Sequence, residues 1–236
     1  MNKYERIARE VKQRIMNKTY SGDDPIPDEI SLASEFQVSR MTIKRALDTL
    51  VMEGLLNRKR GHGTFIVKSV HNGPVNVVVN EMLGLTNVLR GKEIKNKIVA
   101  FDVQFPSEEV AAHLFIDANS PVYHVIRLRV VEGEPYVIER TYMPTKLISG
   151  ITEQVLYGSV YKHIKEELGL NIVGLHRTIR ASKSTELDRE HLDCAADDPI
   201  LEIEQVGYLD TGIPFEYSFS RHRYDKFVFT TVNRMR

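Results

Sequence analysis

Residues 37–67 read QVSRMTIKRALDTLVMEGLLNRKRGHGTFIV, and this stretch decides the fold of the first part of the chain. Ser39 is a favourable N-cap, and Gly54 is typical of the position just after a helix C-terminus. The apolar residues between them recur with helical spacing, which predicts a helix over residues 39–53. Its buried stripe is expected to comprise Ile43, Ala46 or Leu47, Leu50 and Val51.

After Gly54 the pattern changes from helical to extended. Residues 55–59 and 64–67 read as two short strands, and they flank the sequence Arg60-Gly61-His62-Gly63. Two glycines in so short a connection predict a hairpin with a tight tip. A small antiparallel wing is therefore expected directly after the helix.

Two further helices are predicted before this stretch. Residues 4–17 form an amphipathic helix, whereas residues 21–27 contain a glycine and two prolines that end it. Asp28 is a favourable N-cap for a short helix that ends near Phe36, before a tight turn at 37–38. The order helix, helix, turn, helix, hairpin is that of a winged helix-turn-helix. The stripe of the first helix comprises Tyr4, Ile7, Val11 and Ile15.

The outer surface of the helix predicted over residues 39–53 carries side chains that can bind DNA. In a helix-turn-helix, the N-terminal residues of the second helix reach base edges in the major groove. Arginine can donate two parallel hydrogen bonds to guanine, and hydroxyl groups contact phosphates or bases. The helix N-terminus at Ser39 also favours a phosphate. The candidate DNA-contacting side chains on this helix are Arg40, Thr42, Lys44 and Arg45.

The wing adds cations at Arg58, Lys59 and Arg60, and its glycines, Gly61 and Gly63, permit close backbone approach to the minor groove. The alternative is that the charged helix face is merely solvated, but a basic hairpin directly after the helix favours DNA binding. The expected partner is therefore double-stranded DNA. Because two recognition helices must reach successive major grooves, we expect a homodimer on a near-palindromic operator.

Charge divides the chain in the same way. Residues 1–68 contain 13 Lys and Arg against 9 Asp and Glu, whereas the remainder contains 19 against 23. Residues 69–74 have no periodicity and read as part of a linker. The expected organisation is a DNA-binding domain over 1–68, a linker over 69–75, and an effector-binding and dimerisation domain over 76–236.

Composition limits where the protein acts. Cys194 is the single cysteine, so no internal disulfide can form. No apolar run exceeds four residues, and the N-terminus starts with charged residues of both signs. We therefore expect a cytoplasmic protein with no membrane partner.

The second part of the chain alternates hairpins with helices, which predicts an α+β domain built on an antiparallel sheet. Turns are expected at 133–135 and 211–214. Helices are predicted over 108–115, 160–168 and 185–194. Strands are predicted over 98–104, 122–131, 136–143, 172–182, 200–208, 215–223 and 227–232.

Two predicted strands carry polar groups on one face. In 122–131 the even positions are mostly apolar, whereas the odd positions place Arg127 and Arg129 side by side. Two guanidiniums on a sheltered face need an anion, and phosphate matches them well. The alternative is a structural ion-pair ladder with Glu139 or Glu202.

The strand over 215–223 places a carboxylate, two hydroxyls and an imidazole on one face, which suits sugar hydroxyls. These residues are Glu216, Ser218, Ser220 and His222. Ser159 begins a predicted helix, where its hydroxyl and the free N–H groups favour a phosphate. A polar pocket is therefore expected in the second domain.

The first domain resembles the GntR family of bacterial repressors. The chain differs from the family pattern at Ile26 and Asp28, and His62 stands at the wing tip where a cation is common. The resemblance covers essentially residues 4–67. It is carried by Pro25-Ile26-Pro27-Asp28-Glu29, Leu32-Ala33, Val38-Ser39-Arg40-Met41-Thr42, Ala46-Leu47, Glu53-Gly54-Leu55-Leu56 and Arg60-Gly61-His62-Gly63-Thr64-Phe65. The full expected DNA-binding set is Glu29, Ser39, Arg40, Thr42, Lys44, Arg45, Arg58, Arg60, Gly61, His62 and Gly63.

The second domain resembles the effector domain of the HutC subgroup, called UTRA, which has a chorismate-lyase-like fold. The resemblance is carried by Gly84-Leu85-Thr86, Ile126-Arg127-Leu128-Arg129, Pro135 through Glu139, Ser159-Val160-Tyr161, Phe215-Glu216-Tyr217 and Arg223-Tyr224-Asp225-Lys226-Phe227. It implies phosphosugar-binding roles for six of these residues. The full expected effector-binding set is Thr86, Arg127, Arg129, Glu139, Ser159, Tyr161, Glu216 and His222.

The expected function is repression of a sugar operon under the control of a phosphorylated sugar. An amino-acid-derived or fatty-acid effector is the alternative within the same family. An enzyme is not expected, because no Ser/His/Asp group and no glycine-rich phosphate loop stands out, so we assign no catalytic residue and no cofactor. No metal site is expected either: His113, His163 and His176 lack ligand spacing, and the pair His191 and Cys194 is too small for zinc.

Overall fold

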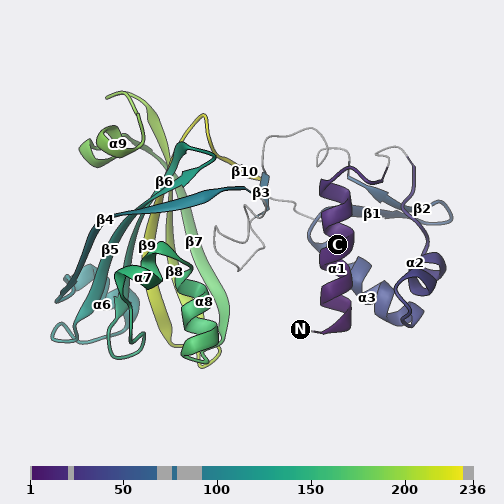
Figure 1. The fold of residues 1–236 in the computed structure, drawn as a ribbon, viewed down its shortest axis with the longest axis horizontal. Helices are drawn as coiled ribbons and strands as arrows, with labels where there is room; N and C mark the ends of the chain where they lie inside the picture. Colours follow the sequence, from purple (N-terminus) through teal and green to yellow (C-terminus); the bar gives the residue numbers. More distant parts are fainter. Residues whose placement is uncertain (1, 21–23, 68–75, 79–91, 231–236) are drawn as a thin grey trace. The chain divides into compact units, whose positions relative to one another are not determined.

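The computed structural model describes residues 2–20, 24–67, 76–78 and 92–230 (Figure 1). The chain divides into two compact units, residues 1–80 with 229–236 and residues 81–228. The predicted linker over 69–75 lies outside the described residues, so the domain limits drawn from the sequence stay predictions. No helix in the described ranges is long and apolar enough to cross a membrane.

The N-terminal unit contains the predicted helices and wing, and their ends are set by local hydrogen bonds. The Asp28 carboxylate accepts the Ser31 N–H at 2.7 Å, and the Ser39 hydroxyl accepts the Thr42 N–H at 3.2 Å. Gly54 has a φ of 73°, the left-handed conformation that stops a helix. The elements are α1 (Lys3–Met16), α2 (Glu29–Glu35), α3 (Arg40–Met52), β1 (Leu56–Lys59) and β2 (Gly63–Ile66).

The core of this unit consists of the stripes predicted from the sequence. Ala46 and Leu47 are both buried, whereas Val51 is only half-buried at the core edge. The wing pairs antiparallel, with Lys59 opposite Gly63. The buried residues shared by the helices and the wing include Ile7, Val11, Ile15, Leu32, Ile43, Leu50, Leu55, Leu56 and Ile66.

The second unit is built on a six-stranded antiparallel sheet with the order β4-β5-β6-β9-β8-β7. Its strands are β4 (Ile94–Gln104), β5 (Val122–Val131), β6 (Glu134–Pro144), β7 (Ile172–Lys183), β8 (Pro199–Leu209) and β9 (Pro214–Arg223). Its helical segments are α6 (Glu108–Leu114), α7 (Glu153–Tyr157), α8 (Val160–Lys162), the π-helical turn η1 (His163–Glu167) and α9 (Glu186–His191). Two short strands, β3 (Asn76–Val78) and β10 (Val228–Thr230), pair with each other. The predicted α+β class is confirmed.

Helices pack against both faces of this sheet. α7 and α8 lie over one face (Figure 1), where Leu156, Val160 and Ile164 join a core with Val125 and Phe215. On the other face, Leu187 and Leu192, from and just after α9, pack against Ile126, Leu128 and Ile138. Both faces of β5 are therefore covered, and its two arginines are enclosed.

Several elements differ from the sequence prediction, among them β3, which was not predicted. β4 starts at Ile94 rather than at 98; its first residues alternate between half-buried and exposed, but Lys95, Asn96 and Lys97 are all polar, so the sequence shows no alternation of polar and apolar residues there. α7 was not predicted; Asn96 Nδ2 caps its end by donating to the Tyr157 carbonyl oxygen at 2.8 Å. The helix expected over 160–168 is a short α8 that continues as η1, and the helix expected to reach 194 ends at His191. The predicted strand over 227–232 is β10, and residues 231–236 lie outside the described part.

Candidate functional site

The exposed face of α3 carries most of the predicted DNA-contacting residues. Arg40, Lys44 and Arg45 are exposed and Thr42 is half-buried, and the Arg40 side chain is 68% accessible. The Ser39 and Thr42 hydroxyls lie 2.9 Å apart at the start of this helix. The structure therefore brings these five residues together on one accessible surface, as base and phosphate contacts require.

Glu29 joins this helix to the wing. One of its carboxylate oxygens accepts from Arg40 Nε at 2.9 Å, and the other accepts from Arg58 Nη2 at 3.3 Å. Arg58 Nη1 also contacts Asp48 Oδ1 at 2.7 Å, so α2, α3 and β1 meet in one ion-pair network. The sequence placed Glu29 in the binding set but gave no role to Asp48, because their contacts cross three elements.

The wing tip contains Arg60, Gly61 and His62, and it turns on residues with positive φ. Gly61 has a φ of 76°, and Gly63 has a φ of 107° with Pro25 Cβ only 3.1 Å from where a side-chain carbon would stand. Gly63 therefore has a local packing reason to be glycine. His62 Nδ1 lies 3.0 Å from the Arg60 carbonyl oxygen, which holds the imidazole against the tip backbone.

In the second unit, Arg127 and Arg129 share the Glu139 carboxylate. Arg127 Nη2 and Arg129 Nη1 lie 2.9 Å and 3.3 Å from Glu139 Oε2. Arg127 Nη1 also donates to the Leu156 carbonyl oxygen of α7 at 3.1 Å. Both arginines are buried, with residue exposures of 8% and 3%. Glu139, rather than Glu202, is thus the acidic neighbour in this cluster, and Glu202 pairs instead with Arg180 and Arg221.

Electrostatics keep the Glu139 carboxylate charged. Burial by itself would raise the pKa of Glu139, but the Arg129 and Arg127 guanidiniums outweigh it and hold the pKa below the usual value. Burial is also the main reason why the pKa of Arg127 is lowered, with Glu139 opposing the shift. A buried anion here is therefore stabilised by two cations at once.

A second polar group lies beside the first on the same sheet face. Glu216 Oε1 accepts from Ser218 Oγ at 2.6 Å and from Gln205 Nε2 at 2.8 Å. Gln205 Nε2 also lies 3.2 Å from the Tyr161 hydroxyl, and Gln205 Oε1 accepts from Arg177 Nε at 2.7 Å. Glu216 and Tyr161, both predicted site residues, are thus joined through Gln205.

Burial raises the pKa of Glu216, although hydrogen bonds from Ser218 and Gln205 oppose the shift. Burial and the nearby Glu216 raise the pKa of the Tyr161 hydroxyl well above its usual value. Tyr161 therefore remains a neutral hydrogen-bond donor and acceptor at physiological pH.

Sequence reasoning missed Gln205 and Arg177. Gln205 pairs with Ser218 across the β8–β9 ladder and with Arg177 across the β7–β8 ladder. A single strand shows only an alternating pattern, and the cross-strand register that joins these residues is non-local. Gln205 and Arg177 could have been identified only if the order β9-β8-β7 and its register had been known.

The remaining predicted effector residues are placed as follows. The Ser159 hydroxyl accepts the Lys162 N–H at 3.2 Å and caps α8. His222 is buried between Tyr136 and Phe227, with ring centroids 5.8 Å and 4.0 Å away. Burial lowers the pKa of His222 to about 3, so the imidazole is neutral. Ser220 lies opposite Glu139 in the β6–β9 register, and Thr86 lies outside the described residues.

Two of the histidines excluded as metal ligands from the sequence, His113 and His163, make ordinary structural contacts. His113 stacks on Tyr217 with ring centroids 4.2 Å apart, and His163 Nε2 lies 2.9 Å from the Ser149 carbonyl oxygen. Among the residues that the structure describes, no three His, Cys, Asp or Glu side chains gather as a metal site would need.

Comparisons with known proteins match both units. The model for "Bacterial regulatory proteins, gntR family" matches residues 3–66, and the UTRA domain model matches residues 89–228. The HTH-type transcriptional regulator GmuR of Bacillus subtilis is 65% identical over 234 residues, which cover 99% of this chain and 99% of GmuR.

Solved structures agree with these matches. The transcriptional regulator YydK of Bacillus subtilis has a TM-score of 0.82 at 27% identity, covering 99% of this chain and 100% of that one. The effector binding domain of the B. subtilis trehalose repressor TreR has a TM-score of 0.54 at 31% identity, covering 60% of this chain and 98% of that one. The predicted winged helix-turn-helix joined to a UTRA-type sheet domain is confirmed.

Proposed function

The chain belongs to the GntR family of bacterial regulatory proteins, with a UTRA domain after its DNA-binding unit, and from this premise we propose that it represses an operon for uptake or catabolism of a sugar. Its relatives are transcription regulators rather than enzymes, and the family architecture combines DNA binding with a small-molecule effector domain. The sugar connection is supported by the likeness of the second unit to the trehalose repressor.

We propose that the effector is a phosphorylated sugar, and the cluster of Arg127, Arg129 and Glu139 carries this proposal. Two guanidiniums turned toward one carboxylate oxygen can also serve the oxygens of a phosphate, to which charge-assisted bonds are strong and directional. Buried cations are stable only when they are paired with anions. The two arginines therefore already form a site that accepts negative charge, and the phosphate of the ligand would bind to it.

Polar groups around this cluster suit the rest of a sugar. Glu139 and Glu216 supply carboxylates for hydroxyl hydrogens, and Tyr161 and Ser159 supply hydroxyls close to α8. His222 is neutral and can donate or accept. We propose that these residues, together with Thr86, hold the sugar and its phosphate.

On the DNA side, we propose that the protein binds a near-palindromic operator as a homodimer. Arg40 and Arg45 contact bases or phosphates from α3, together with Ser39, Thr42 and Lys44. Arg58, Arg60 and the Gly61-His62-Gly63 tip contact the DNA backbone from the wing, and Glu29 orients Arg40 and Arg58.

The effector proposal is tested by a thermal-shift panel of sugar phosphates and the matching free sugars, followed by calorimetry. Arg127→Ala should weaken sugar-phosphate binding at least tenfold, which is about 1.4 kcal/mol. Arg140→Ala, an exposed arginine on the neighbouring strand, is the control and should bind like the parent. Equal binding by parent and Arg127→Ala, or a preference for the free sugar, would refute the phosphate assignment.

The DNA proposal is tested by selecting an operator from random duplexes and titrating variants against it. Arg40→Ala should cost about 1–3 kcal/mol of operator affinity, because a good arginine–base contact is worth that much. Arg9→Ala, an exposed arginine on α1, is the control. Unchanged affinity of Arg40→Ala would remove α3 from the role of recognition helix.

A further inference from the structure

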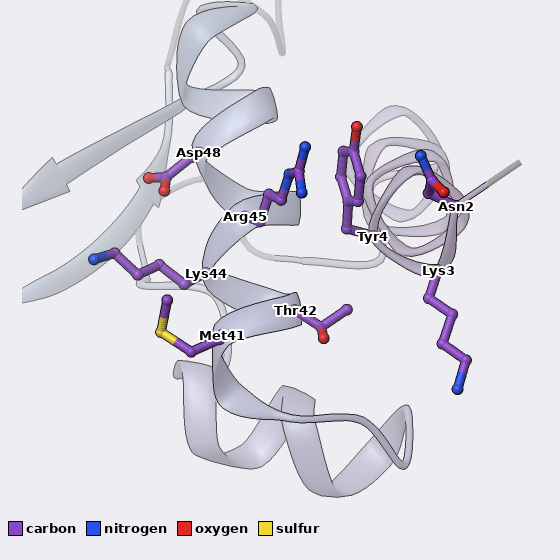
Figure 2. A pocket seen from close by; sticks show the side chains of 8 residues that line it. All are labelled: Asn2, Lys3, Tyr4, Met41, Thr42, Lys44, Arg45 and Asp48. Atoms are coloured by element: carbon purple, nitrogen blue, oxygen red, sulfur yellow. The ribbon is translucent and has the colours of Figure 1, made fainter.

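A polar groove lies between the first turn of α1 and the exposed face of α3 (Figure 2). It combines residues that lie about forty positions apart in the sequence and that only the fold brings together. The lining that concerns us comprises Lys3, Tyr4, Thr42, Lys44, Arg45 and Asp48. Of these, only Thr42, Lys44 and Arg45 of α3 were predicted to contact DNA, so α1 adds groups with no assigned role.

Arg45 and Tyr4 form the centre of this groove. The Arg45 guanidinium carbon lies 4.0 Å from the centroid of the Tyr4 ring, and Figure 2 shows the two side chains reaching toward each other from α3 and α1. Stacking uses the flat face of a guanidinium and leaves its in-plane N–H donors available to an anion. Tyr4 itself packs against the buried core, so it is a firm support for an exposed arginine.

The charge of the groove is positive. Lys3 extends from α1, and Lys44 and Arg45 extend from α3, whereas Asp48 is the one acidic side chain in the lining. Asp48 already pairs with Arg58 of the wing at 2.7 Å, so its charge is balanced from outside the groove. An anion is therefore the ligand that the lining favours.

The groove continues toward the start of the recognition helix. A second concave surface shares Lys3 and Thr42 with it and is also lined by Gln37 and Ser39 from the turn before α3. The two together form one polar surface that runs from α1 past the N-terminus of α3. Because α3 is the helix that we place in the major groove, this surface lies where a flanking strand of the duplex would pass.

We propose that this groove holds a backbone phosphate of the bound duplex, with the Arg45 guanidinium and the Lys3 ammonium as its donors. Tyr4 acts as a positioning residue that holds Arg45 in a fixed plane. The inference rests on the proposed DNA binding and extends it, because it assigns α1 a part in the contact. A phosphate contact of this kind is independent of base sequence.

The test uses a duplex of arbitrary sequence of about 30 base pairs, roughly three helical turns, and needs no knowledge of the operator. Fluorescence anisotropy gives the affinity at several salt concentrations, and the slope of log affinity against log salt counts phosphate contacts. Arg45→Ala and Lys3→Ala should each reduce the magnitude of this slope, and because both donors serve one phosphate, the two changes together should reduce it by about one. The Arg9→Ala control, on the same helix but away from the groove, should keep the parental slope.

The role of Tyr4 is separated from a purely structural role by two substitutions. Tyr4→Phe keeps the aromatic ring and should keep the parental affinity and slope, whereas Tyr4→Leu keeps an apolar side chain but should weaken binding. The double variant Tyr4→Leu/Arg45→Ala should bind no more weakly than Arg45→Ala alone, since both changes disable the same contact. Thermal unfolding of each variant checks that the N-terminal unit is intact.

Parental salt slopes for both Arg45→Ala and Lys3→Ala would overturn the proposal. Additive losses in the double variant would overturn the positioning role of Tyr4. If Arg45→Ala weakens binding of inorganic phosphate but not of the duplex, the groove serves a small anion instead and the DNA assignment is wrong. If the parent protein binds no duplex at low salt, the proposed DNA-binding function itself fails. This outcome is distinct from a failure of the groove proposal, in which the parent binds the duplex and the variants bind it equally well.

Discussion

Two glutamates in this molecule each hold a pair of arginines, one at the surface of the N-terminal unit and one inside the sheet domain. Glu29 contacts Arg40 and Arg58 in a setting where the Arg40 side chain is 68% accessible. Glu139 contacts Arg127 and Arg129, whose side chains are 10% and 4% accessible. The residue types are the same, but the solvent around them differs.

That difference sets what each network can do. Exposed ion pairs contribute only about 0–1 kcal/mol and are screened by salt, so the contacts of Arg40 and Arg58 with Glu29 can be rearranged at little cost, as the proposed contacts with DNA require. Buried charges cannot be left unpaired, because their lost hydration is not replaced. The arginines of the Glu139 cluster can therefore exchange their partner only for another anion, which is why we propose an anionic ligand there.

The largest expected effect comes from removing each carboxylate in turn. Glu139→Gln should destabilise the sheet domain by about 3 kcal/mol, because it leaves two buried guanidiniums without their shared anion. Glu29→Gln, the matched change at the surface, should cost less than about 1 kcal/mol. Urea unfolding followed by circular dichroism measures both, and equal losses would show that burial does not distinguish the two networks.

A smaller effect is expected from pH, through the buried His222 of the sheet domain. The pKa of His222 is lowered to about 3 by burial, against about 6.5 in an unfolded chain. Between these values the unfolded chain binds the extra proton, so the free energy of unfolding falls as pH drops below about 6.5. The loss attributable to His222 should approach about 2 kcal/mol at pH 5.

Urea titrations at pH 7 and pH 5 check this contribution. His222→Phe, which keeps a ring against Phe227 but cannot titrate, should remove that part of the pH dependence. His62→Phe, at the exposed wing tip, should leave it in place. A pH dependence that is identical in parent and His222→Phe would contradict the buried, neutral imidazole.

The smallest effect concerns a glycine in each region. Gly61 in the wing and Gly133 in the β5–β6 turn have φ values of 76° and 85°, and a side-chain carbon at either would meet nothing within 4 Å. Valine at either position should therefore cost a similar backbone strain of about 1–2 kcal/mol. Only Gly61→Val should also weaken duplex binding, if the wing backbone approaches DNA as we propose. Anisotropy titrations of both variants with duplex DNA measure this difference. If Gly61→Val binds the duplex as the parent does, the wing does not contact DNA and only covers the helices.

The two regions also differed in how far the sequence could predict them. Asp28 and Ser39 cap their helices as expected, because capping and the helical stripe depend on residues within a few positions of each other. The strands of the sheet domain were found, but neighbours such as Gln205 and Glu216 were not joined, since their contact depends on strand order. The apolar face of β5 with Ile126 and Leu128 was predicted, whereas the contact between Arg127 and α7 was not.

Residues 156–158, at the end of α7, are held by side chains from two different strands. Arg127 of β5 donates to the Leu156 carbonyl oxygen at 3.1 Å, and Asn96 of β4 donates to the Tyr157 and Gly158 carbonyl oxygens at 2.8 Å and 3.2 Å. The Arg127 guanidinium, which contacts Glu139, therefore also binds α7 to the sheet. Arg127 thus connects the Glu139 carboxylate directly to the backbone just before Ser159 and Tyr161, so a ligand that took the place of one of these partners would also act on the segment that leads into α8.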